Sequence, residues 1–242
     1  TPARADMKSK ILAWLRLARP HFYPMAWVSY SVGAAVAART GRPLDWKVHV
    51  LGCAWVTLVE LVAVLCNEYF DFRADSLNAN AGPFTGGSRM VVSGRLGLPG
   101  LRVAISVALG LVAACGYALC RAFTAGTAWY VVAFLVPALV LAMGYTVPPL
   151  RLSYRGLGEL VVAFIFGPYL VMSGYFLQTG TVMSAAAWGL SLPLFLAVLP
   201  AIILAGVPDR ESDMATSKRT LAVILGIRRS CALAVACSAA AA

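Results

Sequence analysis

Charged residues are scarce in this chain. Only 12% of its 242 residues are Asp, Glu, Lys or Arg, whereas 60% are apolar, and the mean hydropathy is +0.79. This composition excludes a soluble globular domain. A membrane span needs about 20 predominantly apolar residues. Six such windows occur, at approximately 18–38, 48–66, 101–121, 126–146, 157–177 and 185–206, and an incomplete seventh begins near residue 230. We therefore expect an all-α, polytopic transmembrane bundle with six full spans and a partial seventh.

The incomplete seventh window has about half the length of a span. We therefore interpret residues 1–242 as a single transmembrane domain that lacks its last helices. The segment before the first window is basic and amphipathic and runs directly into that window. A cleavable secretion signal does not have this form.

Cysteine and histidine offer no metal site. The six cysteines form no CxxC or Cys/His ligand spacing, and His21 and His49 have no partner at a ligand spacing. We interpret the cysteines, which lie mostly inside the apolar windows, as free buried thiols. Any metal ion must therefore be held by oxygen ligands.

Basic residues are unevenly distributed between the two sides of the predicted membrane. With alternating spans, 16 of the 20 Lys and Arg residues fall on one side, and the other side has only Arg39, Arg42, Lys47 and Arg121. Although a net charge of +10 can indicate nucleic acid binding, this asymmetry is typical of a membrane protein. Cytoplasmic loops are enriched in Lys and Arg, so we expect the richer side to face the cytoplasm.

Six of the ten acidic residues lie in two short segments, NEYFDFRAD from Asn67 and DRESD from Asp209. Side chains at i and i+4 share one face of a helix. The predicted metal ligands with this spacing are Asn67, Asp71, Asp75, Asp209 and Asp213. Mg²⁺ prefers hard oxygen ligands and is often shared between carboxylates and substrate phosphates. Both segments fall on the predicted cytoplasmic side, so we expect them to form one magnesium site.

Basic residues follow each acidic segment, as a diphosphate site requires. Lys218 and Arg219 come after the second segment, and Arg73 and Arg89 accompany the first. Arg can bind two phosphate oxygens at once, and Lys acts as a compact point charge. We therefore predict that these four residues bind diphosphate. They belong to two loops, 67–100 and 207–229, that look like counterparts of each other.

Two further acidic residues, Glu60 and Glu159, lie within or at the edge of the windows, where an ionised side chain is costly and by default marks function. For Glu60 the alternative is a neutral, hydrogen-bonded side chain inside the bundle. For Glu159 the alternative is a pair with Arg155, one helical turn earlier. Glu211, between Asp209 and Asp213, should point elsewhere on a helix, toward a basic residue or an outer water.

Four motifs together resemble the UbiA superfamily of intramembrane prenyltransferases. They are RPHFYP from Arg19, NEYFDFRAD as an NxxxDxxxD motif, YTVPPLRLSYRGLGEL from Tyr145, and DRESDMATSKRTLAVILG from Asp209. They occur in the family's order and cover about residues 18–229. The resemblance implies a helical bundle around a central cavity, with both acidic motifs facing each other at its cytoplasmic end. It also implies Mg²⁺ as cofactor and a polyprenyl diphosphate as substrate.

The resemblance assigns roles to individual residues. Asp71, Asp209 and Tyr145 would be catalytic, with Tyr145 near the reacting allylic carbon, where aromatic faces stabilise a cation. The substrate pocket would contain Arg19, Thr146, Arg151 and Glu211. Where the family commonly has GKRT, this chain has Ser217 before Lys218. We expect that change to affect the geometry of the loop more than the chemistry.

The resemblance leaves the acceptor open. GLGELVVAFIFGPYLVMSGYFLQTG is most similar to the branch that prenylates dihydroxynaphthoate for menaquinone. The alternatives are 4-hydroxybenzoate, homogentisate, a tetrapyrrole or a lipid acceptor, and outside the enzymes a cation transporter. A CDP-alcohol phosphotransferase would need DG followed by AR between its acidic residues, which neither segment contains. We expect membrane lipid as a partner and no nucleic acid, and the sequence does not indicate an oligomeric state.

Overall fold

The computed structural model describes residues 2–41, 43–82 and 85–241, and helices dominate it. Residues 83 and 84 of the first predicted loop therefore lie outside the described residues, as do residues 1 and 242 at the ends of the predicted domain. The α-helices are α1 (Pro2–Ala18), α2 (Tyr23–Ala38), α3 (Trp46–Phe70), α4 (Phe72–Leu77), α5 (Leu98–Arg121), α6 (Ala125–Gly144), α7 (Gly158–Phe164), α8 (Leu170–Thr179), α9 (Ala185–Ala205), α10 (Arg210–Ala215) and α11 (Leu221–Ala241). A π-helical segment, Ile165–Tyr169, joins α7 to α8, so these three form one continuous rod.

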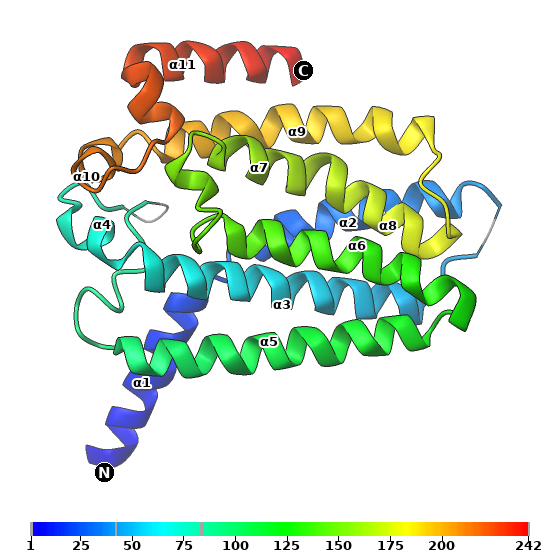
Figure 1. Ribbon diagram of the computed structural model, residues 1–242, viewed down its shortest axis with the longest axis horizontal. Helices are drawn as coiled ribbons and strands as arrows, with labels where there is room; N and C mark the ends of the chain where they lie inside the picture. The colour runs from blue at the N-terminus through cyan, green and yellow to red at the C-terminus, as the bar shows by residue number, and fades with distance from the viewer. Residues whose placement is uncertain (1, 42, 83–84, 242) are drawn as a thin grey trace.

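The long helices run side by side along the longest axis of the molecule (Figure 1). Six described segments are long and apolar enough to span a membrane: Trp46–Phe70, Leu98–Arg121, Gly126–Gly144, Gly158–Thr179, Ala185–Ala205 and Leu221–Ala241. The predicted fold class is thereby confirmed.

Two predicted windows differ from the helices that form. The window 18–38 is divided because Arg19 has a left-handed φ of 50° and precedes Pro20, so α2 has only 16 residues. At 1.5 Å per residue it is about 24 Å long, shorter than a hydrocarbon core. The partial seventh helix begins earlier than residue 230, at Leu221, and Gly226 with φ 73° interrupts it. In Figure 1 the part of α11 after this break lies alongside α9.

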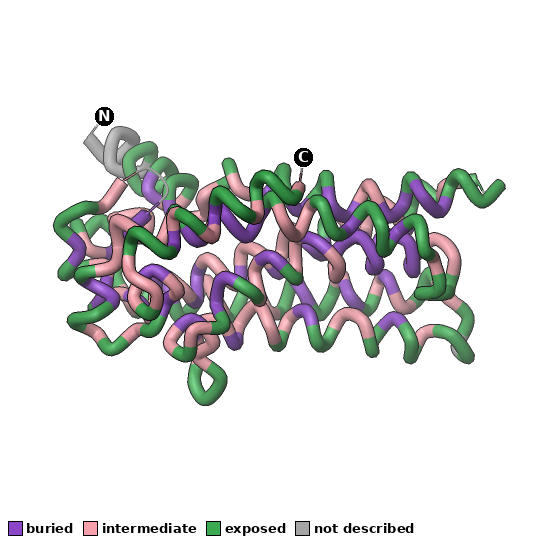
Figure 2. Tube along the Cα trace, turned by 90° about the horizontal axis from the view of Figure 1, so that it is seen from above, coloured by how far each residue is buried: buried purple, intermediate pink, exposed green. Residues whose placement is uncertain are grey.

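Two glycines let α2 pack closely against α8. A Cβ atom at Gly33 would lie 1.8 Å from the carbonyl oxygen of Val171, and one at Gly174 would lie 1.9 Å from that of Tyr30. Small residues at helix contacts are typical of membrane bundles. The outer surface is apolar, with exposed side chains such as Val103, Val107 and Leu111 on α5. Figure 2 shows this alternation of exposed and buried positions along the helices.

Both acidic segments lie at the same end of the bundle. Asp71 lies at the junction of α3 and α4, and Asp209 precedes α10. The short helices α4 and α10 pack against each other, at the left of Figure 1. The turn after α6, which carries Tyr145, is at this end as well. The fold therefore brings the two predicted loops together.

Candidate functional site

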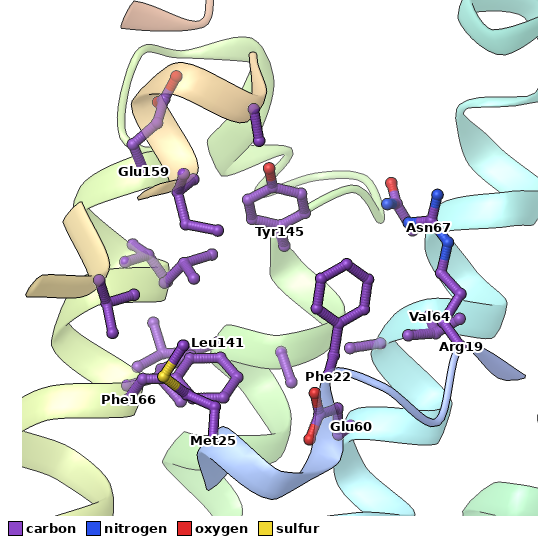
Figure 3. A pocket seen from close by; sticks show the side chains of 18 of the residues that line it. Arg19, Phe22, Met25, Glu60, Val64, Asn67, Leu141, Tyr145, Glu159 and Phe166 are labelled. Carbon is purple, nitrogen blue, oxygen red and sulfur yellow. The ribbon is translucent and has the colours of Figure 1, made fainter. Parts of the chain in front are cut away.

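A cavity of about 310 Å³ extends from these acidic segments into the bundle (Figure 3). At one end it is lined by Asp71, Asp75, Asp209 and Asp213, and we call this the acidic end. Further in, the lining is mostly apolar and comes from α2, α3, α6, α9 and the rod formed by α7, the π-helical segment and α8. Its residues include Trp55, Leu141, Phe166, Leu170 and Val198. The cavity thus joins a strongly polar site to an apolar chamber.

All five predicted metal ligands line this cavity. Asn67 offers an oxygen to an incoming cation, because its Oδ1 atom is buried and has no hydrogen-bond partner among the described residues. Within those residues, however, no three His, Cys, Asp or Glu side chains are close enough to hold a metal by themselves. Amide and carboxylate oxygens from both segments fit Mg²⁺, which also takes ligands from water and substrate phosphate.

Lys218 lies between the two acidic segments. Its Nζ atom is 2.7 Å from Asp71 Oδ2 and 3.8 Å from Asp213 Oδ1. Burial opposes the charge of Lys218, but the carboxylates of Asp71 and Asp213 nevertheless raise its pKa well above the ordinary value. The ammonium group therefore stays charged and compensates both carboxylates.

The second acidic segment is held by groups from the first loop. Asn78 Nδ2 donates to Asp209 Oδ1 at 2.6 Å, and the backbone N–H of Gly86 donates to Asp209 Oδ2 at 3.3 Å. Thr220 Oγ1 donates to Asp213 Oδ2 at 3.2 Å. Burial raises the pKa of Asp213 to about 6, although Lys218 lowers it in part. Asp209 is therefore fixed by neutral donors, and Asp213 by a hydroxyl and a cation.

Asp75 lies against Gly87 of the first loop. A Cβ atom at Gly87 would be 2.2 Å from Asp75 Oδ2, and Gly87 has a φ of +70°. Burial, followed by the charge of Asp71, raises the pKa of Asp75 to about 7. Bound Mg²⁺ would favour the ionised form of this carboxyl group.

The four predicted diphosphate-binding residues take different positions. Lys218 lines the cavity. Arg89 is half-buried, does not line the cavity, and donates through Nη1 to the backbone carbonyl oxygen of Asp75. Arg73 and Arg219 are exposed and lie outside the cavity lining. The structure thus brings only Lys218 of the four into the cavity wall.

The predicted substrate-pocket residues also separate. Arg19 lines the cavity, lies near Asn67 in Figure 3, and has Nε 4.0 Å from Glu68 Oε1. Thr146 is 1% exposed and its hydroxyl has no partner among the described residues, but it is not part of the lining.

Arg151 packs its guanidinium over the ring of Tyr154 at 4.3 Å and does not reach the lining. Glu211 is exposed and outside the lining, because on α10 it points away from the face shared by Asp209 and Asp213. Tyr145 does line the cavity, where Figure 3 shows its ring.

Several contacts at the site were not predicted. Tyr154 donates its hydroxyl to Asp71 Oδ1 at 2.9 Å, and Asn78 holds Asp209. The only signal for Tyr154 was its place in the motif that begins at Tyr145.

Glu159 accepts a 2.7 Å hydrogen bond from the backbone N–H of Leu221, the first residue of α11. The alternative pair with Arg155 does not form, because Arg155 donates to the carbonyl oxygen of Pro149 instead. Glu159 thereby fixes the start of the helix that follows the second loop.

Ser217, at the position where the resemblance leads us to expect glycine, has a left-handed φ of 59°. Glycine adopts this conformation without strain, whereas a residue with a Cβ atom does not. The departure from the family pattern therefore concerns backbone geometry, and it lies directly before Lys218.

Comparison with known proteins agrees with this geometry. The profile of the UbiA prenyltransferase family matches residues 26–242. The chain belongs to this family. It is 30% identical to the 1,4-dihydroxy-2-naphthoate octaprenyltransferase of Escherichia coli, over 90% of this chain and 70% of that protein. It is 29% identical to the 2-carboxy-1,4-naphthoquinone phytyltransferase of Synechocystis, over 94% of this chain and 70% of that one.

Solved UbiA structures share the fold. A UbiA homolog from Archaeoglobus fulgidus, bound to DMAPP and Mg²⁺, has a TM-score of 0.61 and 17% identity, covering 94% of this chain and 74% of that one. A digeranylgeranylglyceryl phosphate synthase has a TM-score of 0.59 and 17% identity, covering 96% of this chain and 75% of that one. The predictions of the family and of a multi-pass membrane prenyltransferase are confirmed.

Proposed function

We propose that this UbiA family member transfers the prenyl group of a polyprenyl diphosphate to a naphthoate-type aromatic acceptor, with Mg²⁺ as cofactor. One observation carries the proposal: both acidic segments and Lys218 line one end of a cavity that is apolar further in. The named activities of the E. coli and Synechocystis relatives support the acceptor class, and the ligands of the A. fulgidus homolog support the donor and the metal. Menaquinone-type quinone biosynthesis is the corresponding role.

Asn67, Asp71, Asp75, Asp209 and Asp213 are the residues that would hold the metal. The unpartnered amide oxygen of Asn67 and the carboxylate oxygens of the four aspartates match the ligands that Mg²⁺ prefers. When bound, Mg²⁺ neutralises the charge that develops on the leaving diphosphate.

The protein's own residues act on both sides of the bond that breaks. The carbon–oxygen bond of the prenyl diphosphate opens, and its electron pair leaves with the diphosphate. Lys218 stabilises that charge as a preorganised cation. The face of Tyr145 stabilises the allylic cation, and the apolar lining keeps water from reacting with it. The acceptor ring then forms the new carbon–carbon bond and loses a proton.

We also propose that the acidic end faces the cytoplasm and that residues 1–242 act as one domain in contact with membrane lipid. The excess of Lys and Arg on that side supports this orientation. The orientation is tested with Arg73→Cys, a change at an exposed position, by labelling the new thiol with a membrane-impermeant reagent. Labelling in inverted vesicles but not in intact cells is expected, and the reverse would contradict the orientation.

The reaction is tested with Asp71→Ala and Asp209→Ala in membranes supplied with Mg²⁺ and a labelled prenyl diphosphate. Each variant should lose at least about 10³-fold in kcat, or about 4 kcal/mol, while staying folded and inserted. Wild-type activity in both variants would contradict the assignment.

The acceptor is tested by offering the wild type 1,4-dihydroxy-2-naphthoate, 4-hydroxybenzoate, homogentisate and a glycerol phosphate lipid, with products identified by mass. Preferential prenylation of the naphthoate is expected. A different main product would contradict this choice and identify another acceptor. Ion flux in liposomes without prenyl transfer would favour a transporter.

A further inference from the structure

Glu60 is an acidic side chain inside the cavity that neither the metal site nor the diphosphate site uses. It lies on α3, seven residues before Asn67, and lines the cavity. Figure 3 shows its carboxyl group beneath the ring of Phe22, on the side of the chamber away from Tyr145. At 1.5 Å per residue, Glu60 is about 10 Å along the helix from Asn67.

The carboxyl group of Glu60 has no hydrogen-bond or ion-pair partner among the described residues, and its Oε2 atom is buried. The neighbouring Tyr23 does not donate to Glu60, because its hydroxyl donates to the carbonyl oxygen of Ala18 at 2.6 Å. Glu68, on the same helix, is the contrast: its carboxylate accepts from both the backbone N–H and the hydroxyl of Ser88. The chain thus partners one carboxyl group of α3 and leaves the other facing the cavity.

The lining around Glu60 is apolar and includes Met25, Val56, Ala63 and Val64. A buried polar group without a partner is costly, and in native structures such a group usually has a role. Since no described residue supplies the hydrogen bond, the carboxyl group is open to a donor on a ligand in the cavity.

The chemistry of the two substrates indicates which of them can donate a hydrogen bond to Glu60. A prenyl diphosphate is polar only at its diphosphate, which belongs at the acidic end, and its chain carries no donor. A hydroxylated aromatic acceptor does carry donors. We propose that Glu60 is an acceptor-binding residue, whose carboxyl oxygen hydrogen-bonds a hydroxyl group on the part of the acceptor ring system remote from the acidic end.

This inference rests on the proposed function and narrows its acceptor. The separation of Glu60 from Asn67 along α3 favours an aromatic diol whose second hydroxyl lies away from the carbon that is attacked. An aromatic diol such as 1,4-dihydroxy-2-naphthoate meets this requirement, whereas a monophenol such as 4-hydroxybenzoate has no second hydroxyl. Glu60 would then contribute to the selection of the acceptor without touching the leaving group.

The experiment compares Glu60→Leu and Glu60→Gln with Leu61→Met, a conservative change at the next position of α3, which lies outside the cavity lining. Michaelis constants are measured separately for 1,4-dihydroxy-2-naphthoate and for the prenyl diphosphate. Glu60→Leu should raise the acceptor KM by about tenfold or more, because a site that binds a hydroxyl discriminates strongly. The KM for the prenyl diphosphate should stay within about twofold. Glu60→Gln, which keeps a hydrogen-bonding oxygen, should be intermediate, and Leu61→Met should match the wild type.

Direct binding separates this proposal from the proposed function. Dissociation constants are measured without turnover for 1,4-dihydroxy-2-naphthoate and for its two monohydroxy analogues, 1-hydroxy-2-naphthoate and 4-hydroxy-2-naphthoate. One of the two analogues lacks the hydroxyl that binds Glu60. For that analogue, Glu60→Leu should leave the dissociation constant unchanged.

The proposal is overturned if the folded Glu60→Leu protein binds the diol as the wild type does. An equal rise in KM for both substrates would overturn it as well. If the wild type binds the diol through Glu60 but transfers no prenyl group to it, the proposed function fails and the binding role stands.

Discussion

The two loops that follow the acidic segments hold each other's carboxylates, but with different chemistry. The first loop gives neutral donors to the second segment: the amide of Asn78 and the backbone N–H of Gly86 both bind Asp209. The second loop gives a cation to the first segment, since Lys218 binds Asp71. The loops were expected to be counterparts, and in the structure each one completes the other's site.

The difference shows how the charge at this end is arranged. Asp71 and Asp213 share the ammonium of Lys218, whereas Asp209 is held by the neutral donors of Asn78 and Gly86. Neutral donors orient a carboxylate without cancelling its attraction for a metal ion. We therefore expect the second loop to act mainly on the diphosphate and the first loop mainly on the metal.

The largest effect that separates the loops should come from Lys218→Ala. It should weaken apparent binding of the prenyl diphosphate by about 10- to 100-fold, because charge-assisted contacts are the strong ones. Arg219→Ala is the matched control, with the same charge at the next position but an exposed side chain, and it should change binding by less than about twofold. Titration with the prenyl diphosphate at saturating Mg²⁺ measures both. Equal losses of binding in the two variants would show that Arg219 also binds the diphosphate, although its side chain is exposed.

How far the sequence predicted this site depends on the range of the contacts. The i and i+4 spacing of Asp71 and Asp75, and of Asp209 and Asp213, is local, and the structure places all four at one cavity. The bonds of Asn78 to Asp209 and of Tyr154 to Asp71 join residues 131 and 83 positions apart. Helical periodicity carries no information about such pairs.

The fold shows the same limit. Apolar windows located the long helices correctly, because hydrophobicity alone decides what can span a membrane. The start of α2 and the break within α11 depend instead on left-handed backbone at Arg19 and Gly226, which hydropathy does not detect. Arg73, Arg219 and Glu211 lie within the motifs, yet their side chains are exposed because helix and loop direction turn them outward.

Asn78→Ala tests the neutral side of the comparison. Loss of the hydrogen bond to Asp209 should lower kcat/KM by about tenfold, the effect of removing one donor to a charged group. It should do so mainly by raising the Mg²⁺ concentration needed for half-maximal activity. Asn80→Ala is the control, because its backbone N–H, which binds Asn78 Oδ1 at 2.8 Å, is retained. A loss in Asn78→Ala that excess Mg²⁺ does not reduce would place Asn78 outside the metal site.

Gly87→Ala tests whether close packing of the first loop positions Asp75. Gly87 and Gly94 have φ values of +70° and +72°, so alanine at either position should cost about 1 kcal/mol in stability through backbone strain. Only at Gly87 would the new Cβ meet Asp75 Oδ2, whereas at Gly94 no atom lies within 4 Å. Gly87→Ala should therefore also weaken Mg²⁺ activation by about three- to tenfold, which is roughly 1 kcal/mol. The same Mg²⁺ dependence in both variants would show that Asp75 does not need this contact.

The smallest expected effect concerns the backbone of the second loop. The first loop meets its left-handed positions partly with glycine, but the second loop has Ser217 at φ 59°, directly before Lys218. Ser217→Gly should relieve this strain, and the greater freedom of glycine in the unfolded chain should offset part of the gain. The net increase of about 0.5–1 kcal/mol corresponds to a rise in Tm of roughly 1–4 °C for a chain of this length. Ser217→Ala keeps the Cβ atom and should not raise Tm, so an equal rise in both variants would trace the effect to the hydroxyl. If Ser217→Gly raises Tm and leaves binding of the prenyl diphosphate unchanged, the position of Lys218 is set by its contacts with Asp71 and Asp213, and the backbone before it only tolerates that position.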